Sequence, residues 1–353
     1  MRGWVAEADV SAVVFGPDLP ARRSHPCPRI GLVFGAGGVL GAAWMTGALA
    51  RLQDRLPGAA ADVDLVVGTS AGSVLAAALR CRASLDEMVA WQCGDASGIL
   101  SESVVLAAKD GPLPPLPHLR LGSLPLARAA LLRPLQVPPW VGASGWLPHG
   151  RGQHAALRSL VSALHSRHQQ HPFGGGAPPN WADGHTWVAA MDYDSGRHVL
   201  FGRQDVPRAS LPDAVVASCS IPGWYEPTVI DGRRYVDGGV RSATSLSALR
   251  GTVVHEVYVL APMASTEPDH PLQPHLRIER RFRQLITLVL LRQAKALSAE
   301  GKHVTIVTPG PRDLAVMGAN LMDPRRRQDV LEVSLRTSAD SLTTLDRVSS
   351  RAA

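Results

Sequence analysis

The segment Gly68–Gly72 constrains this chain more than any other part of its sequence. It consists of Gly68, Thr69, Ser70, Ala71 and Gly72. An apolar run over residues 63–67 precedes it, and a helix-forming run over residues 73–79 follows it. This pattern predicts a strand, a sharp turn with Ser70 at its apex, and a helix, which together form a nucleophile elbow. The flanking glycines let the strand and the helix pack closely, so Ser70 is the candidate nucleophile.

A Gly-x-Ser-x-Gly motif alone indicates a catalytic serine only moderately, because it occurs by chance in roughly one chain of this length in five. The alternative is a turn that contains a serine and has no catalytic role. The strand and helix around the motif weaken that alternative. A second glycine-rich segment upstream, Gly35–Gly41, weakens it further.

This upstream segment follows an apolar run over residues 30–34 and begins a helical pattern over residues 42–52. Its glycines are Gly35, Gly37, Gly38 and Gly41. A glycine-rich loop at a helix N-terminus offers free N–H groups to an anion. The dinucleotide fingerprint fails because its sixth position is Leu40, and no Lys-Ser or Lys-Thr pair completes a phosphate-binding loop. An oxyanion hole for Ser70 is the remaining interpretation.

A serine hydroxyl needs a base, and both the late histidines and Asp237 are candidates for that group. Asp237 ends a predicted strand over residues 234–236 and precedes Gly238 and Gly239. A carboxylate at the C-terminal end of a strand lies where a sheet edge places an active site, although a second turn is the alternative. The late histidines occur in no recognisable motif; they are His255, His270, His275 and His303.

These motifs together resemble the patatin-like phospholipase family. The resemblance rests on residues 35–41, 68–72, 217–223 and 237–239, and it extends from about residue 29 to residue 262. It implies a three-layer α/β/α fold with a central, mostly parallel sheet. Few lysines and abundant Arg, Ala and Pro suggest a GC-rich genome, so we expect a bacterial member.

The resemblance also implies roles for single residues. In this family a Ser-Asp dyad without histidine catalyses ester cleavage, so Ser70 would attack the carbonyl and Asp237 would act as general base and acid. The N–H groups of Gly37 and Gly38 would form the oxyanion hole. Two positions depart from the family pattern, which usually has a glycine in place of Ala36 and a basic residue in place of Leu40. Ala36 is tolerable if its φ is negative, and Leu40 removes a positive charge from the site.

Composition limits the other functions. The chain has 353 residues, 45 % of them hydrophobic, and a formal net charge of +6. A basic protein favours anionic surfaces, but no nucleic-acid motif is present. The densest basic run contains Arg277, Arg280, Arg281 and Arg283, which we interpret as a solvated helix face, with contact to anionic lipid as the alternative. The four cysteines, predicted to be buried thiols, are Cys27, Cys81, Cys93 and Cys219. Neither they nor the histidines of residues 149–171 have other metal-ligand residues close by in the sequence, so we expect no metal and no cofactor.

The chain divides into three predicted parts. Residues 1–28 form a loose extension without the features of a secretory signal, residues 29–310 form the hydrolase domain, and residues 311–353 form a helical segment with a fraying tail. Within the domain, the Pro- and Gly-rich residues 94–182 form an insertion, for which a lid or mouth of the site and a disordered loop without function are the two interpretations. The longest apolar stretch, residues 285–291, is too short to span a bilayer and is expected to be buried. A cytoplasmic protein with peripheral lipid contact is therefore expected.

Further elements follow from periodicity and turn residues. Predicted strands cover residues 186–191, 198–201, 228–230, 233–236, 253–260 and 304–307, and predicted helices cover residues 155–164, 213–218, 278–298 and 324–339. The pair Asp231-Gly232 predicts a two-residue hairpin turn.

Two other functions stay open at this stage. One is an α/β-hydrolase with a Ser-His-Asp triad, although only about forty residues of recognisable fold precede Ser70. The other is an inactive lipid-binding protein, which retention of Ser70 and Asp237 disfavours. The sequence does not choose among phospholipid, lysophospholipid, glyceride and thioester substrates, nor does it indicate an oligomeric state.

Overall fold

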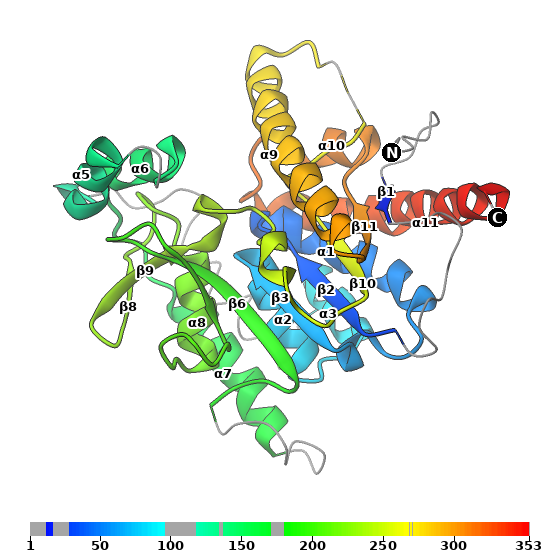
Figure 1. The fold of residues 1–353 in the computed structure, drawn as a ribbon, viewed down its shortest axis with the longest axis horizontal. Coiled ribbons are helices and arrows are strands. Elements are labelled where there is room, and N and C mark those ends of the chain that lie inside the picture. Colours follow the sequence, from blue (N-terminus) through cyan, green and yellow to red (C-terminus); the bar gives the residue numbers. More distant parts are fainter. Residues whose placement is uncertain are drawn as a thin grey trace.

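The computed structural model describes residues 12–16, 28–95, 118–133, 137–170, 180–267, 269 and 271–352. Within these residues, nine strands form a central sheet with helices on both faces (Figure 1). The strand order is β1-β11-β10-β2-β3-β6-β9-β8, and β7 pairs with β6. The strands are β1 (Ala12–Phe15), β2 (Ile30–Phe34), β3 (Leu65–Thr69), β6 (His185–Asp192), β7 (His198–Phe201), β8 (Thr228–Ile230), β9 (Arg233–Asp237), β10 (Glu256–Leu260) and β11 (His303–Val307). The predicted three-layer α/β/α architecture is confirmed.

The middle of the sheet is parallel. Strands β11, β10, β2, β3 and β6 run in one direction, while β1, β7 and β9 pair antiparallel to their neighbours. Every residue of β2 and β3 is buried, which is typical of parallel strands covered on both faces. Because parallel strands end at one edge of the sheet, the glycine-rich segment after β2 and Ser70 after β3 lie next to each other. We call this the carboxyl edge.

Helices form the two outer layers. One face carries α1 (Gly38–Leu52), α2 (Ala71–Arg80), α3 (Leu85–Gln92), α7 (Ala155–Gln169), α8 (Leu211–Cys219) and α11 (Arg327–Ala352), and the other carries α9 (Pro274–Ala299). A hydrophobic core lies on each face of the sheet. Successive residues along a strand point to opposite faces, so they belong alternately to the two cores. Val66 packs with the first core and its neighbour Val67 with the second. Helix α10 (Pro311–Met317) follows β11, and short 3₁₀ helices cover Gln53–Arg55, Ala60–Asp62, Gly238–Val240, Leu246–Leu249 and Pro324–Arg326.

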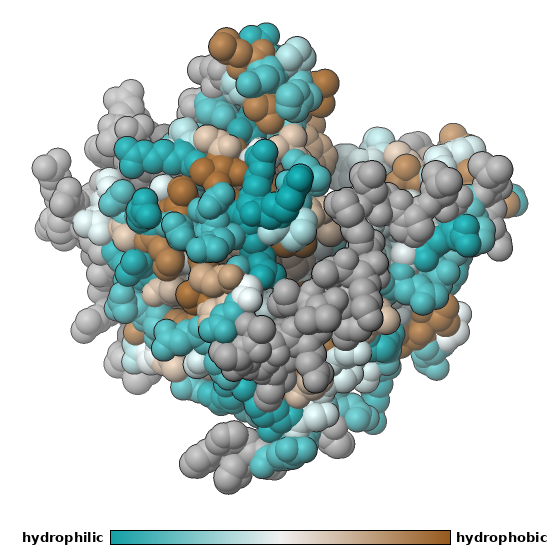
Figure 2. All heavy atoms as spheres, turned by 180° about the vertical axis from the view of Figure 1, so that it is seen from behind, coloured by the Kyte–Doolittle hydropathy of each residue, from teal (hydrophilic) through white to brown (hydrophobic). Residues whose placement is uncertain are grey.

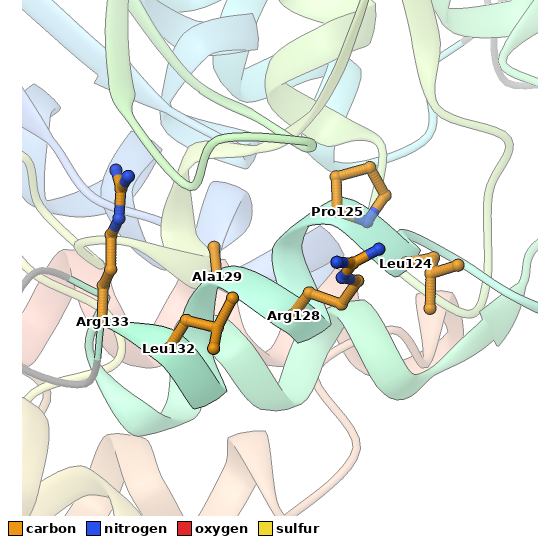
Figure 3. Close-up of a pocket in the computed structure, with 6 residues that line it drawn as sticks. All are labelled: Leu124, Pro125, Arg128, Ala129, Leu132 and Arg133. Atoms are coloured by element: carbon orange, nitrogen blue, oxygen red, sulfur yellow. The ribbon is translucent and has the colours of Figure 1, made fainter.

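The described part of the predicted insertion consists of a side lobe and one core helix. In the lobe, β4 (His118–Leu121) pairs with β5 (Pro148–His149), and α5 (Leu124–Leu132) packs on α6 (Pro139–Trp146). A cavity of about 400 Å³ along α5 is bordered by Leu124, Pro125, Arg128, Ala129, Leu132 and Arg133 (Figure 3). Helix α7, in contrast, places Leu160 and Leu164 in the main core. Whether any part of the insertion moves as a lid stays a prediction.

The hairpin prediction is confirmed. Strands β8 and β9 pair antiparallel, with Ile230 opposite Arg233. The two turn residues, Asp231 and Gly232, have φ values of 49° and 74°. Positive φ at both positions is the signature of a type I′ turn, which fits the twist of the flanking strands.

Both ends of the chain are more regular than predicted. The expected loose extension is wrong for residues 12–15, because this apolar segment forms β1 and pairs antiparallel with β11 at the edge of the sheet. Residues 1–11 and 17–27 lie outside the described part. At the other end, α11 continues to Ala352, beyond the predicted helix end at residue 339, and the fraying of the tail stays a prediction.

Helix α9 also differs from the prediction. Within the stretch 285–291, Leu285, Leu288 and Val289 are exposed and Leu290 is buried, because only one side of α9 contacts the sheet. The basic run is not a solvated face throughout, since Arg280 and Arg283 are buried while Arg277 and Arg281 are exposed. Of the four cysteines, Cys81 is buried, Cys219 is half-buried, Cys93 is exposed, contrary to expectation, and Cys27 lies outside the described residues.

Candidate active site

Ser70 lies at the apex of a strand-to-helix turn. Strand β3 ends at Thr69 and α2 begins at Ala71, so the predicted strand, turn and helix are present. The backbone of Ser70 has φ 54° and ψ −125°, a conformation that a residue with a side chain rarely adopts. The side chain is 7 % exposed and borders a cavity. This strained backbone is the geometry expected of a nucleophile elbow.

The two glycines of the motif allow the close contacts that were predicted. A Cβ atom at Gly72 would lie 2.3 Å from the carbonyl oxygen of Phe34, which ends β2. A Cβ atom at Gly68 would lie 2.6 Å from the carbonyl oxygen of Gly72. Both contacts are with backbone atoms, so neither position has room for a side chain.

Ser218 holds the backbone of the turn from α8. Its hydroxyl accepts the N–H of Ser70 at 2.8 Å and donates to the carbonyl of Ala189 in β6 at 2.6 Å. The sequence places Ser218 in the family-like segment 217–223 without indicating this role. The contact joins residues 148 positions apart, and no local pattern marks it.

The glycine-rich segment after β2 turns directly into α1. Gly37 is the N-cap, and Gly38 has a φ of 60°, in the region that favours glycine. Among the described residues, neither the N–H of Gly37 nor that of Gly38 has a hydrogen-bond acceptor, whereas the N–H of Gly35 donates to Leu260 and that of Ala36 to Ala243. Ala36 does not have a positive φ, so the substitution at this position is tolerated. Two N–H groups without an acceptor in the described part of the chain therefore lie at a helix N-terminus.

Leu40 does not face the site. Its side chain is fully buried in the main core, and its N–H donates to the carbonyl of Leu321 at 2.9 Å. At this position, an apolar side chain packed in the core therefore replaces the basic residue that is usual in the family.

Later segments of the chain pack against this glycine loop. A Cβ atom at Gly37 would lie 2.6 Å from Cγ of Pro262, and a Cβ atom at Gly38 would lie 2.8 Å from the sulfur of Met322. The carbonyl of Pro262 accepts a hydrogen bond from Nη1 of Arg283 at 2.5 Å. Arg283 is buried and is ion-paired with Glu279. A buried ion pair on α9 thus fixes the proline that contacts the loop.

Asp237 ends β9 and faces Ser70. It is 5 % exposed, and its Oδ1 accepts the N–H of Gly239 at 2.7 Å. Burial raises the pKa of Asp237 to about 6, although the nearby Ser70 hydroxyl and the N–H of Gly239 act in the opposite direction. A carboxylate with this pKa is ionised at neutral pH and can still accept a proton.

None of the histidines among the described residues is hydrogen-bonded to Ser70. His154 borders the same cavity, but its Nε2 lies 3.1 Å from the carbonyl oxygen of Cys219, its ring stacks on Tyr225, and burial lowers its pKa to about 4. His255 and His303 lie at the opposite edge of the sheet, at the start of β10 and β11. His275 is exposed on α9, and His270 lies outside the described residues.

The histidines of the insertion have other partners. Nε2 of His165 lies 3.3 Å from the carbonyl oxygen of Trp181, and Nε2 of His168 lies 3.0 Å from Oδ1 of Asp183. His171 is outside the described part. In that part, no group of three or more His, Cys, Asp or Glu side chains is placed to hold a metal ion.

A largely apolar cavity of about 250 Å³ opens at Ser70. Its walls come from α1, α2, the end of α3, α7 and the segment 322–327. The lining includes Val39, Ala42, Val74, Trp91, Leu157, Leu160, Ile221 and Met322. The described part of the insertion therefore contributes α7 to the wall, and the cavity chemistry suits a hydrocarbon chain.

Similarity to known proteins agrees with this geometry. The family model of patatin-like phospholipase matches residues 32–250, more than half of the chain. No curated protein sequence matches this chain. Among solved structures, VipD from Legionella pneumophila is 12 % identical with a TM-score of 0.40, over 90 % of this chain and 67 % of VipD.

Two other solved structures have similar values. The type III effector ExoU of Pseudomonas aeruginosa is 15 % identical with a TM-score of 0.32, over 95 % of this chain and 63 % of ExoU. Human GIVD cytosolic phospholipase A2 is 13 % identical with a TM-score of 0.37, over 92 % of this chain and 59 % of the human one. The chain thus spans about three fifths to two thirds of these proteins. Because the TM-scores are low, the assignment depends on the family model. The chain belongs to the patatin-like phospholipase family, and the prediction of a lipid acyl hydrolase is confirmed at the level of that family.

Proposed function

We propose that the protein cleaves carboxylic esters of lipids through an acyl-enzyme formed on Ser70, with Asp237 as general base and acid. The observation that carries this proposal is the buried carboxylate of Asp237, which lies close enough to the Ser70 hydroxyl for that hydroxyl to lower its pKa, while burial raises the pKa to about 6. A serine in a strained turn next to a desolvated carboxylate has no evident structural purpose, because both features cost stability.

Formation of the acyl-enzyme needs two proton transfers, and so does its hydrolysis. Asp237 takes the proton of the Ser70 hydroxyl as Oγ attacks the ester carbonyl. The tetrahedral intermediate then collapses, the bond to the leaving alcohol breaks, and Asp237 returns the proton to that alcohol. Water then attacks the acyl-enzyme while Asp237 takes its proton; the bond to Ser70 Oγ breaks, Asp237 returns the proton to Oγ, and the fatty acid leaves.

The negative charge of each intermediate needs a binding site. The unpaired N–H groups of Gly37 and Gly38 begin α1 and adjoin Ser70 across the β2–β3 pair. Two such donors favour an oxyanion, and the helix N-terminus adds a partial positive charge. The supporting glycines, Gly35, Gly41, Gly68, Gly72, Gly238 and Gly239, keep the backbones close enough for this arrangement.

The substrate would place one acyl chain in the apolar cavity beside Ser70. Phospholipid, lysophospholipid, glyceride and thioester all present such a chain, and all fit the acyl-enzyme route. The exposed leucines and tryptophans of the side lobe, such as Leu132 and Trp140, suit peripheral contact with lipid. None of the helices in the described ranges is both long and apolar enough to cross a bilayer.

A labelled fluorophosphonate tests the proposal directly, because it reacts only with an activated serine. The wild-type protein should be labelled, and Ser70→Ala should not. Asp237→Asn should lower kcat on a short-chain ester by roughly a thousandfold or more. His154→Gln should keep most of the activity, whereas a Ser-His-Asp triad would require its loss. A folded wild-type protein that stays unlabelled would instead identify an inactive lipid-binding protein.

A further inference from the structure

Helix α9 carries a row of exposed apolar side chains on the side turned away from the sheet. Ile278 is 74 % exposed, Phe282 55 % and Leu285 62 %. Val289 continues the row, and Leu288 lies beside it. The spacing of four, three and four residues keeps the row on one face of the helix. We call these five residues the α9 stripe.

The charges next to the stripe have one sign. The exposed ionised residues of α9 are Arg277, Arg281, Arg292 and Lys295. The one acidic residue of the helix, Glu279, is partly buried and is ion-paired with Arg280 and Arg283. The exposed surface of α9 therefore combines large apolar groups with cations and carries no carboxylate. A helix of this composition is typical of binding in the interface of an anionic membrane.

The stripe lies near the candidate active site. Arg283 holds the carbonyl of Pro262, whose ring contacts Gly37, so α9 passes the level of the glycine loop at Arg283. The nine residues 274–282 precede that point, which corresponds to roughly 13 Å of helix. In Figure 1, this end of α9 projects beyond the carboxyl edge of the sheet. In Figure 2, the projecting end at the top shows hydrophobic surface directly beside hydrophilic surface.

We propose that the α9 stripe docks on a phospholipid surface that contains anionic lipids, and so brings the carboxyl edge to its substrate. This role rests on the proposed lipid hydrolysis. The charges beside the stripe favour an anionic membrane over a second copy of the chain as its partner. Two stripes face to face would oppose four cations with four cations, whereas anionic head groups would pair with them. The formal net charge of +6 acts in the same direction.

Co-sedimentation with vesicles tests the docking. The full chain carrying Ser70→Ala is mixed with vesicles of phosphatidylcholine, alone or with added phosphatidylglycerol, so that no lipid is hydrolysed. The protein should bind the mixed vesicles much more tightly, and added salt should weaken that binding. Equal binding to both kinds of vesicle, or binding to neither, would overturn the proposal.

Two pairs of substitutions locate the contact. In the same background, Arg277→Gln with Arg281→Gln should weaken binding by about thirtyfold, because each cation near an anionic membrane contributes about a factor of five. Ile278→Ser with Phe282→Ser should weaken it by at least about tenfold. The matched controls, Arg208→Gln with Arg336→Gln and Val229→Ser with Val253→Ser, change exposed residues elsewhere and should bind unchanged. Stripe variants that bind like the parent protein would refute the role of α9.

Two further measurements separate docking from catalysis and from self-association. With Ser70 restored, the stripe variants should hydrolyse a soluble short-chain ester at the wild-type rate and lose activity on mixed vesicles. If Ser70→Ala still cleaves the soluble ester, the proposed function fails while the vesicle data stand. Light scattering should find the same molar mass for wild type and stripe variants. A dimer that the stripe substitutions dissociate, without vesicle binding, would assign the stripe to a second copy instead.

Discussion

Ser70 and the pair Gly37–Gly38 both lie where a parallel strand turns directly into a helix, but the two turns are held by different parts of the chain. At Gly68 and Gly72, the atoms that leave no room for a side chain belong to the turn itself and to the end of the neighbouring strand β2. At Gly37 and Gly38, they belong mainly to Pro262 and to residues 321 and 322.

This difference separates the two halves of the proposed catalytic machinery. The steric limits on the nucleophile turn come from local sequence and from one adjacent strand, and the distant residues Ser218 and Ser245 add hydrogen bonds to Ser70 and Thr69. The position of the oxyanion donors depends on segments more than two hundred residues later, including the Arg283–Pro262 contact. We therefore expect substitutions at the first turn to damage folding, and substitutions at the second to damage catalysis first.

Gly72→Ala should have the largest effect. The new Cβ atom would lie 2.3 Å from the carbonyl oxygen and 2.6 Å from the carbonyl carbon of Phe34, and neither backbone atom can move without separating β2 from α2. We expect the free energy of unfolding to fall by about 4 kcal/mol or more, measured by urea denaturation. Gly58→Ala is the matched control, because nothing lies within 4 Å of its Cβ position. Near-normal stability of Gly72→Ala would show that the elbow is not held by this contact.

Gly37→Ala should affect catalysis more than folding. Its φ of −178° is accessible to alanine, but the Cβ atom would lie 2.6 Å from Cγ of Pro262 and 2.8 Å from Cα of Gly41. The loop must shift, so we expect kcat to fall by roughly a hundredfold and stability by about 1 to 3 kcal/mol. KM on a soluble ester should change little. A loss of stability as large as that of Gly72→Ala would remove the distinction between the two turns.

The contrast also explains which parts of the molecule the sequence reveals. The strand, turn and helix around Ser70 follow from consecutive residues, as does the Asp231-Gly232 hairpin that leads to Asp237. Local periodicity and turn chemistry determine these elements, so the predictions match the structure closely. The sheet order, with β6 between β3 and β9, has no such local signal.

The errors concern contacts between distant residues. Arg283 is buried because Glu279 neutralises it and Pro262 accepts its hydrogen bond, and neither partner is evident from a run of arginines. The apolar stretch 285–291 covers about two helical turns, so it includes every face of α9, and only the face toward the sheet is buried. Local patterns predict an element well and its burial poorly when the element packs on one side only.

The activity should depend on pH through Asp237. Burial raises the pKa of Asp237 to about 6, so the base becomes protonated below that pH, and kcat/KM on a soluble ester should fall about tenfold per unit there. A rate that stays constant down to pH 5 would exclude Asp237 as the base.

Stability should respond to the same titration with the opposite sign. The folded state binds this proton more tightly than the unfolded state, in which the pKa of an aspartate is near 3.8. The stabilisation is therefore fully present below pH 4 and is lost as the pH rises through 6, by about 2 to 3 kcal/mol. Asp237→Asn lacks this titration, so the difference in unfolding free energy between wild type and variant should show it.

The smallest effect tests the distant hydrogen bond that reaches the backbone of Ser70. Ser218→Ala leaves the N–H of Ser70 and the carbonyl of Ala189 without their partner, which should cost about 1 to 3 kcal/mol of stability. Because Gly68 and Gly72 still hold the turn, kcat should fall only by about three- to tenfold, with KM unchanged. Ser220→Ala is the matched control, since its buried hydroxyl bonds to Val216 and Thr228 rather than to Ser70. It should lower stability similarly and leave kcat unchanged. If Ser218→Ala lowers kcat as much as Gly37→Ala does, the elbow depends on distant contacts as strongly as the glycine loop.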